Sequence, residues 1–271
     1  MKAFVLDLTK CQCCYSCQIG CKDEHCGNDW MPYARPQPET GQFWMRFTTF
    51  ERGATPQLKV AYIPVLCQHC DDAPCIEACP IEGALYQRPD GLVIIDPKIC
   101  TGCQLCIPAC PYGTIFYNSG LQIAQKCTGC AHLLDRGWPI KEPRCVNNCP
   151  GEVYTFGEES ELSSLIAEAE RLTPNFGDTP DTRVYYKGLP KRFIAGCVYD
   201  PATKEVVIGA TCTLTGDATG TATTDDFGDF WLEGLPVANN ITLTIEGDGK
   251  SKTIDSISTE MDVALGDIPL S

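Results

Sequence analysis

Cysteine is the residue type whose number and spacing could do chemistry in this chain. The chain has 271 residues, of which 20 are cysteine. A chain long enough for about two domains buries apolar cores of its own, so disulfide scaffolding is a poor explanation for so many thiols. All but two of the cysteines lie between Cys11 and Cys149; the exceptions are Cys197 and Cys212. Thiols clustered in this way more often bind metal or do redox work than form disulfides.

Sixteen of the cysteines form four quartets with repeating spacing. The first and third quartets read C-x2-C-x2-C-x3-C, and the second reads C-x2-C-x4-C-x3-C. The fourth reads C-x2-C, then fourteen residues, then C-x3-C, and a proline follows each of the last three quartets. In chain order the quartets are Cys11, Cys14, Cys17 and Cys21; Cys67, Cys70, Cys75 and Cys79; Cys100, Cys103, Cys106 and Cys110; and Cys127, Cys130, Cys145 and Cys149.

This spacing is typical of ferredoxin motifs. Thiolates two residues apart on a tight loop converge on one iron-sulfur cubane, and the cysteine after the x3 gap binds the other cluster of a pair. Zinc is the competing interpretation, since four thiolates also suit a tetrahedral zinc site. Zinc ribbons, however, separate two C-x2-C pairs by a longer loop and need neither a third cysteine nor a following proline. The quartets therefore predict four [4Fe-4S] clusters.

The segments between the quartets predict short elements that would position the thiols. Apolar and β-branched runs flank turn signals twice, which indicates two hairpins, and short helices are expected just before the last cysteine of the second and third quartets. A helical period with acidic residues at its start predicts a surface helix that closes this part of the chain. The expected hairpins are 84–87 with 92–95 and 114–117 with 122–124, and the expected helices are 76–78, 107–109 and 158–172. Together these elements predict an α+β fold, a duplicated ferredoxin-like domain over residues 1–191.

Residues 192–271 have a different pattern. Apolar and polar residues alternate between Gly and Asp turns, which predicts a small all-β, immunoglobulin-like sandwich of seven antiparallel strands. Cys197 and Cys212 fall on predicted strands, and two free core thiols are favoured over a disulfide. We expect this domain to be an interaction module.

The residues around the fourth quartet carry a family resemblance. Cys127-Thr-Gly-Cys130-Ala-His-Leu-Leu, followed by Pro143-Arg144-Cys145-Val-Asn-Asn-Cys149-Pro150, resembles the iron-sulfur subunits of molybdopterin oxidoreductases related to dimethyl sulfoxide reductase. The resemblance covers roughly residues 1 to 192. With the C-terminal sandwich included, the chain is most similar to small subunits of the pyrogallol–phloroglucinol transhydroxylase type. Some of those lack one quartet, whereas all four are intact here.

The resemblance implies how the quartets share clusters. In that family the first quartet pairs with the fourth, and the second with the third. The implied ligand sets are Cys11, Cys14, Cys17 and Cys149; Cys21, Cys127, Cys130 and Cys145; Cys67, Cys70, Cys75 and Cys110; and Cys79, Cys100, Cys103 and Cys106.

The resemblance also implies the partners. A molybdenum or tungsten bis-pterin cofactor would lie only in a large catalytic subunit, and this chain would conduct electrons between that cofactor and an outer carrier. The substrate class implied is hydroxylated aromatic compounds, to which a hydroxyl group is transferred, added or removed. Because an unbroken cluster series is useful mainly when electrons leave the complex, a net redox reaction is favoured. The alternative is a free-standing polyferredoxin-like carrier with no obligate catalytic subunit.

Charge and composition exclude other classes of function. The formal charge is -14, from 35 acidic and 21 basic residues, which argues against nucleic-acid and anionic-membrane partners. No apolar run is long enough to span a membrane, and the N-terminus has no signal-peptide core. We therefore expect a cytoplasmic protein, although a partner with a twin-arginine signal could export it as a passenger.

No catalytic constellation is apparent. The three histidines, His25, His69 and His132, lie beside cysteine motifs and form no triad. His69 is expected to pack beside a cluster, and a role as a cluster ligand is the alternative. Cys13 and Cys26 are expected to be buried small side chains rather than ligands. Lys98, Lys126 and Arg144 lie close to quartet cysteines, where they either offset cluster charge or are simply solvated.

Overall fold

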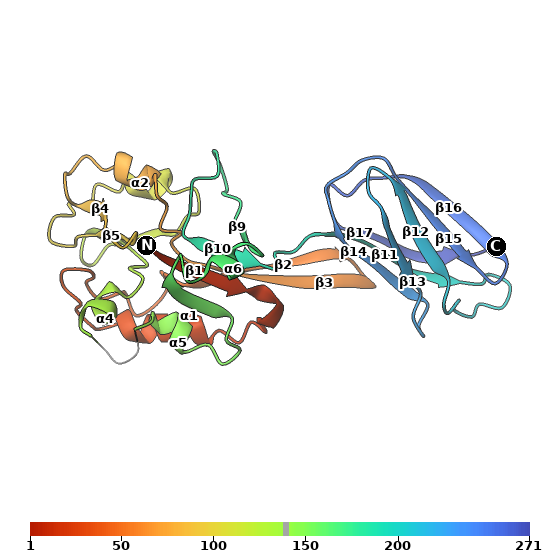
Figure 1. The fold of residues 1–271 in the computed structure, drawn as a ribbon, viewed down its shortest axis with the longest axis horizontal. Coiled ribbons are helices and arrows are strands. Elements are labelled where there is room, and N and C mark those ends of the chain that lie inside the picture. Colours follow the sequence, from red (N-terminus) through yellow and green to blue (C-terminus); the bar gives the residue numbers. More distant parts are fainter. Residues whose placement is uncertain (138–140) are drawn as a thin grey trace. The chain divides into compact units, whose positions relative to one another are not determined.

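A computed structural model of the chain describes residues 1–137 and 141–271. The chain divides into two compact units, the first made of residues 1–48 and 62–189 and the second of residues 49–61 and 190–271. Figure 1 shows the elements of each unit. The first unit contains all four quartets, and the second contains the alternating C-terminal sequence.

A four-stranded sheet ties together the two ends of the first unit. Its strands are β1 (Lys2–Asp7), β8 (Tyr154–Glu158), β9 (Glu170–Arg171) and β10 (Val184–Lys187), in the order β8-β1-β10-β9. β1 runs parallel to β10 and antiparallel to β8, with Phe4 opposite both Val184 and Phe156. Alternate residues of β1 face opposite sides of the sheet, as the pleat requires. Phe4 belongs to the main core of the unit, whereas Val5 packs with Leu162 in a smaller cluster.

Both predicted hairpins are confirmed. In the first, β4 (Leu85–Gln87) pairs antiparallel with β5 (Val93–Ile95), and Gly91 adopts a φ of 90° in the turn between them. In the second, β6 (Ile115–Asn118) pairs antiparallel with β7 (Ile123–Lys126). The predicted turn signals therefore mark the correct places, because glycine is the residue that reaches positive φ without strain.

The helices of the first unit are short, and those expected near 76–78 and 107–109 are present. The helices are α1 (Ser16–His25), α2 (Pro74–Glu77), α3 (Cys106–Ala109), α4 (Ala131–Asp135), α5 (Arg144–Asn147) and α6 (Ser163–Ile166), with a 3-10 turn at Leu8–Lys10. In the part of the chain that the structure describes, no helix has the length and apolar character needed to cross a membrane.

The prediction of a surface helix over residues 158–172 is wrong. Only α6 is helical there; Glu158 ends β8, and Glu170 and Arg171 form β9. Glu170 and Arg171 pair with Tyr186 and Tyr185 of β10, and Leu162 packs beneath the sheet. Tertiary strand pairing outweighs a weak local helical preference here.

The second unit contains a sandwich of seven described strands. One sheet has the order β14-β11-β17 and the other β13-β12-β15-β16. The strands are β11 (Arg192–Tyr199), β12 (Thr211–Gly216), β13 (Gly220–Thr223), β14 (Asp229–Leu235), β15 (Ile241–Gly247), β16 (Lys250–Ile257) and β17 (Val263–Pro269). The prediction of purely antiparallel pairing is wrong for β17, which runs parallel to β11. β17 follows β16, which belongs to the other sheet. β17 is therefore not joined to β11 by a hairpin that would make the two strands antiparallel.

The two cysteines of this unit lie on strands, as predicted, and both are free thiols. Cys212 of β12 is fully buried in the core between the sheets. Cys197 of β11 is only partly buried, with its Sγ 3.4 Å from the carbonyl oxygen of Phe227. The expectation of two core thiols therefore holds for Cys212 alone.

A β-hairpin from the quartet region contributes its tip to the second unit. β2 (Arg46–Ala54) and β3 (Gln57–Val65) form this two-stranded ribbon, and residues 49–61 belong to the second unit. Arg52 Nε and a terminal nitrogen of the same guanidinium lie 2.8 Å and 2.7 Å from the two carboxylate oxygens of Asp262. The side chains are only 10% and 5% exposed. Asp262 also accepts a hydrogen bond from the backbone N–H of Phe193, so this ion pair joins the ribbon to β11.

We predict that Asp262→Asn destabilises the second unit by about 3 kcal/mol, because it leaves the Arg52 cation buried without a counter-charge. Hydrogen exchange of the β11 amides measures the effect as lost protection. The matched control is Glu233→Gln, which removes the partner of Lys59 at a pair whose side chains are 39% and 54% exposed. We expect that control to cost less than about 1 kcal/mol. Equal effects of the two variants would show that the buried pair does not hold the ribbon in place.

Candidate metal centres

The sixteen quartet thiols gather into four groups, each drawn from two quartets. The thiols of groups 1 and 4 line two cavities. In groups 2 and 3, burial raises the pKa of the thiols, and the thiols lie so close together that neighbouring thiolates raise it further. Group 1 is Cys11, Cys14, Cys17 and Cys149; group 2 is Cys21, Cys127, Cys130 and Cys145; group 3 is Cys67, Cys70, Cys75 and Cys110; group 4 is Cys79, Cys100, Cys103 and Cys106. These are the sets that the family resemblance implies, and their role as ligands stays a prediction.

Short helices distribute the thiols between neighbouring groups. Cys17 and Cys21 lie one turn apart on α1, and they belong to groups 1 and 2 respectively. α1 contacts α5, which carries Cys145 of group 2 and ends just before Cys149 of group 1. α2 and α3 are in contact in the same way: α2 carries Cys75 of group 3 and ends just before Cys79 of group 4, and α3 carries Cys106 of group 4 and ends just before Cys110 of group 3. Each pair of helices therefore exchanges a cysteine between two groups.

The loops between the ligand candidates contain left-handed residues. In the first C-x2-C loop of each quartet, positive φ occurs at Cys13 (52°), His69 (46°), Gly102 (71°) and Gly129 (61°). Backbone turned in this way directs successive N–H groups toward one point, which favours an anion there. Cys13, which belongs to none of the groups, occupies such a turn position.

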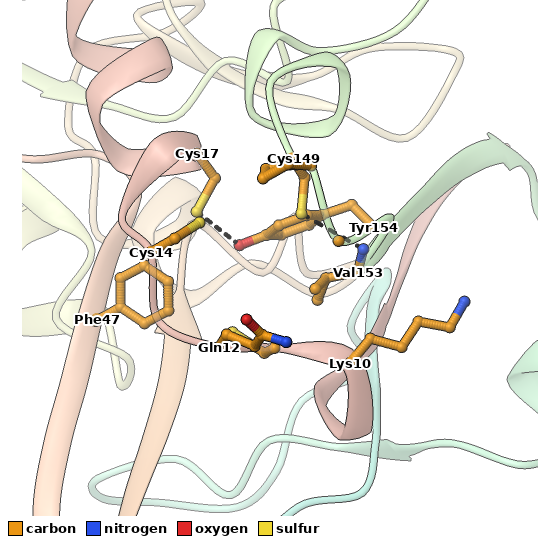
Figure 2. Close-up of a pocket in the computed structure, with 11 residues that line it drawn as sticks. Lys10, Gln12, Cys14, Cys17, Phe47, Cys149, Val153 and Tyr154 are labelled. Atoms are coloured by element: carbon orange, nitrogen blue, oxygen red, sulfur yellow. Dashed lines mark hydrogen bonds between the residues drawn. The ribbon is translucent and has the colours of Figure 1, made fainter.

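Group 1 borders an open cavity of about 200 Å³ (Figure 2). The Tyr154 hydroxyl donates a hydrogen bond to Cys17 Sγ at 3.2 Å, and the Val153 N–H donates to Cys149 Sγ at 3.4 Å. Burial raises the pKa of Cys17 to about 11, and the hydrogen bond from Tyr154 opposes that rise. Cys14 is exposed, so this group lies near solvent.

Group 2 is enclosed by protein. The Gly129 N–H donates to Cys127 Sγ and the Arg144 N–H to Cys130 Sγ, both at 3.4 Å, and His25 Nε2 lies 3.8 Å from Cys130 Sγ. Burial raises the pKa of Cys127 to about 11 and that of Cys130 to about 12. All four thiols of this group are buried.

A polar network forms one wall of group 2. Glu24 accepts a hydrogen bond from Arg144 Nε at 2.7 Å and lies 3.0 Å from His132 Nε2. Trp30 stacks on His132 with the ring centroids 4.6 Å apart. Burial lowers the pKa of His132, and that of His25 to about 3, so both rings are neutral. Arg144 thus contributes its backbone N–H to the group, while its charge is balanced by Glu24.

Group 3 is contacted by a fully buried cation. Lys126 Nζ donates to Cys67 Sγ at 3.4 Å, and its side chain is 2% exposed. The backbone N–H of His69 also approaches Cys67 Sγ, at 3.5 Å, while His69 Nδ1 accepts from the Val93 N–H at 2.9 Å. His69 therefore packs beside the group with its imidazole turned to the hairpin. Burial raises the pKa of Cys75 to about 12, and the Cys67 thiolate adds to that rise.

Group 4 lies at the surface again. Cys103 is exposed, whereas Cys106 is buried, and burial raises its pKa to about 11. Cys79 Sγ is 3.6 Å from the carbonyl oxygen of Ile81. Among the described residues, no side chain donates a hydrogen bond to a sulfur of this group. Lys98, two residues before Cys100, is exposed to solvent.

The groups follow one another in the order 1, 2, 3, 4. Burial raises the pKa of Cys145, Cys127 and Cys75, and a thiolate of the adjacent group raises each further. The adjacent thiolates are Cys17 for Cys145, Cys67 for Cys127 and Cys106 for Cys75. The series therefore begins and ends in groups with an exposed thiol, and its two inner groups are buried.

The donor set suits an iron-sulfur core larger than a single ion, which becomes an anion once four thiolates bind it. Within residues 1–137 and 141–271, no three His, Cys, Asp or Glu side chains are arranged around one metal ion. In group 1 the four thiols instead line a cavity, with a hydroxyl and an N–H directed at the sulfurs. In group 3 an ammonium points at a thiol and, in the described part of the chain, hydrogen bonds to no carboxylate. These features fit iron-sulfur clusters held by thiolates.

Paired cysteine groups linked by short helices, next to ferredoxin-type hairpins, define an iron-sulfur protein. Comparison with known proteins agrees. Residues 58–159 match the family described as a 4Fe-4S dicluster domain, and residues 194–267 match the carboxypeptidase regulatory-like domain. The chain thus combines a ferredoxin-type region with a β-sandwich.

Relatives that the chain covers over most of their length define the family more narrowly. The chain is 38% identical to the pyrogallol hydroxytransferase small subunit of Pelobacter acidigallici over 98% of both chains. It is 34% identical to a tetrathionate reductase subunit of Salmonella typhimurium, over 71% of this chain and 74% of the relative. It is 30% identical to the arsenate respiratory reductase iron-sulfur subunit of Shewanella, over 67% of this chain and 94% of the relative. The chain belongs to the iron-sulfur electron-transfer subunits of molybdopterin oxidoreductases, and it holds [4Fe-4S] clusters.

Some residues at the groups carry no motif that sequence reasoning can use. Tyr154 follows the fourth quartet by five residues, and only strand pairing with β1 aims its hydroxyl at Cys17. Glu24 lies among other charged residues of α1, and nothing in its spacing indicates that it pairs with Arg144. Lys126 and Arg144 are detectable from their position beside cysteines, but their burial and partners are not.

We predict that Gly20→Ala disrupts groups 1 and 2. A Cβ on Gly20 of α1 would lie 2.1 Å from the Asn148 side-chain nitrogen and 2.8 Å from its Cγ, so the Asn148 side chain or the segment after α5 that carries it must shift. Overpacking of this kind costs about 1–3 kcal/mol. The measurement is the rate of iron loss to a chelator under anaerobic conditions, which we expect to increase.

Gly157→Ala is the matched control, because its Cβ would make only ordinary contacts, the nearest at 3.7 Å. We expect that variant to lose iron at the native rate. Native iron retention in Gly20→Ala would contradict the tight approach of α1 to Asn148.

Proposed function

We propose that this chain carries four [4Fe-4S] clusters and conducts electrons between a molybdenum or tungsten bis-pterin cofactor in a larger catalytic subunit and an outer redox partner. The observation that carries the proposal is the series of four thiol groups, buried in the middle and near solvent at both ends. Clusters bound there would supply one-electron transfer. The chain's own residues bind them, order them and exclude water from the inner two.

The ligand assignment follows the four groups. It gives each cluster three thiols of one quartet and one thiol of another, within a duplicated ferredoxin-like domain over residues 1–191. Support comes from the helix pairs α1 with α5 and α2 with α3, which exchange cysteines in the same manner. The repeated exchange is the feature expected of a duplicated two-cluster unit.

The substrate proposal rests on the relative with end-to-end similarity. That relative is named as the small subunit of a pyrogallol hydroxytransferase. We propose that the large partner of this chain likewise acts on hydroxylated aromatic compounds. A net redox reaction is favoured over a redox-neutral transfer, because all four quartets are intact and an unbroken series is useful when electrons leave the complex.

The proposed site of action is the cytoplasm, where thiols stay reduced; export together with a signal-bearing partner is the other route. Residues 192–271 form the proposed interaction module, a sandwich domain that contacts the large subunit. Its core is supplied by the facing sheets, so it needs no cluster for its own stability.

We predict four [4Fe-4S] clusters per chain, each with four iron atoms, in protein purified anaerobically from native cells. Iron and sulfide analysis gives the count, and electron paramagnetic resonance of the reduced protein identifies the cluster type. Zinc in place of iron, or appreciably fewer than four clusters, would contradict the proposal.

Co-purification separates a subunit from a free carrier. We expect the native chain to elute with a larger polypeptide that contains a pterin and molybdenum or tungsten. A cluster-loaded chain that elutes alone, with neither metal present, supports the free-standing polyferredoxin-like carrier instead.

A further inference from the structure

Lys126, the last residue of β7, combines complete burial with contact to two thiol groups. Its Nζ lies 3.4 Å from Cys67 Sγ in group 3 and 3.0 Å from the carbonyl oxygen of Cys127 in group 2. It also donates to the carbonyl oxygen of Val93. The ammonium group therefore lies where the two inner groups of the series approach each other.

The surroundings of Lys126 contain no ordinary counter-charge. In the described part of the chain, its hydrogen bonds go to one sulfur and two carbonyl oxygens, none of which belongs to a carboxylate. A buried ammonium without an anion is strongly unfavourable. Negative charge on the sulfurs of group 3 is what stabilises it here.

The other three groups differ in the donors they receive. Group 1 receives a neutral hydroxyl from Tyr154, and group 2 receives backbone N–H groups. Group 4 receives no side-chain donor from the described residues, and Lys98 near it is in solvent. Arg144 beside group 2 has its charge balanced by Glu24. Of the described side chains, Lys126 is therefore the cation that touches a thiol without a carboxylate partner.

We infer that Lys126 makes the cluster of group 3 the most readily reduced of the series, so that this inner position holds the first electron that enters the chain. The inference rests on the proposed function, because it takes the four groups as cluster sites. Reduction adds one negative charge to a cluster. A cation at hydrogen-bonding distance in a low-dielectric interior stabilises that extra charge, whereas solvent screens a surface lysine.

The test is a redox titration of the purified holoprotein, followed by electron paramagnetic resonance, in native chain and in Lys126→Met. Methionine is close to lysine in shape and removes the charge. We expect the highest midpoint potential to fall by 59 mV or more, which corresponds to a tenfold change in the reduction equilibrium of a one-electron couple. The other three potentials should move much less.

Three further variants separate charge from hydrogen bonding. Lys126→Gln keeps a donor but not the charge, and we expect it to lower the same potential as methionine does. Lys98→Met is the matched control, an equal loss of charge near group 4 at an exposed site, and it should leave all four potentials unchanged. Tyr154→Phe removes a neutral donor from Cys17, and we expect a smaller shift at a different cluster.

A variant at a predicted ligand covers the case in which Lys126 substitutions prevent cluster insertion. Cys110→Ser replaces one thiol of group 3, and it should alter the signal of the first cluster to be reduced. A change confined to a cluster reduced later would overturn the inference, as would an unshifted highest potential in a four-cluster Lys126→Met or Lys126→Gln protein. A native protein with fewer than four clusters contradicts the proposed function, which is a separate outcome.

Discussion

A thiolate taken out of water must be met by hydrogen-bond donors or positive charge, and this chain gathers sixteen quartet thiols although its formal charge is already -14. Oxidised clusters with four thiolates each would add about -2 apiece. The first unit meets this demand locally. Left-handed residues in the ligand loops turn N–H groups inward, the Tyr154 hydroxyl is directed at Cys17, and Lys126 is buried against Cys67. The mostly acidic surface residues contribute little to this balance, because solvent screens them.

The same demand explains why the fold of the first unit is so sparse in regular structure. Four-residue helices such as α2 and α3 are too short to be stable alone. Each carries one cysteine and is followed within two residues by a second, about one turn further on, which lets one short segment supply thiols to two groups. Gly20 shows how this packing restricts the sequence, because a Cβ at this position of α1 would overlap the Asn148 side chain. The contacts that pack these helices together are therefore the same contacts that gather the thiols of the four groups.

Much of this could be predicted from the sequence, because the strongest signals are local. The quartets are short-range patterns, and the hairpins follow from turn residues such as Gly91. The C-terminal strands follow from alternation of apolar residues. The parts that could not be predicted depend on contacts between distant segments. Glu170 and Arg171 pair with β10 instead of continuing a helix, and β17 runs parallel to β11. Arg52 forms an ion pair with Asp262, which is 210 residues away in the sequence. The burial of Lys126 belongs to this second class, since an exposed lysine such as Lys98 has the same kind of neighbours in sequence.

The spatial order of the groups differs from their order in the chain, and this has a consequence for assembly. Groups 3 and 4 are built from residues 67–110, whereas groups 1 and 2 join residues 11–21 to residues 127–149. Closing the longer loop costs more entropy before any contact forms. β1 reduces that cost, because it pairs with β8 directly after the fourth quartet and with β10 at the end of the unit. Lys126 and Cys127 are adjacent in sequence, so the buried cation that completes group 3 also starts the quartet that forms group 2. The local half of the series closes shorter loops and costs less entropy to form, and its completion through Lys126 positions Cys127, the first thiol of the half that needs both ends of the chain.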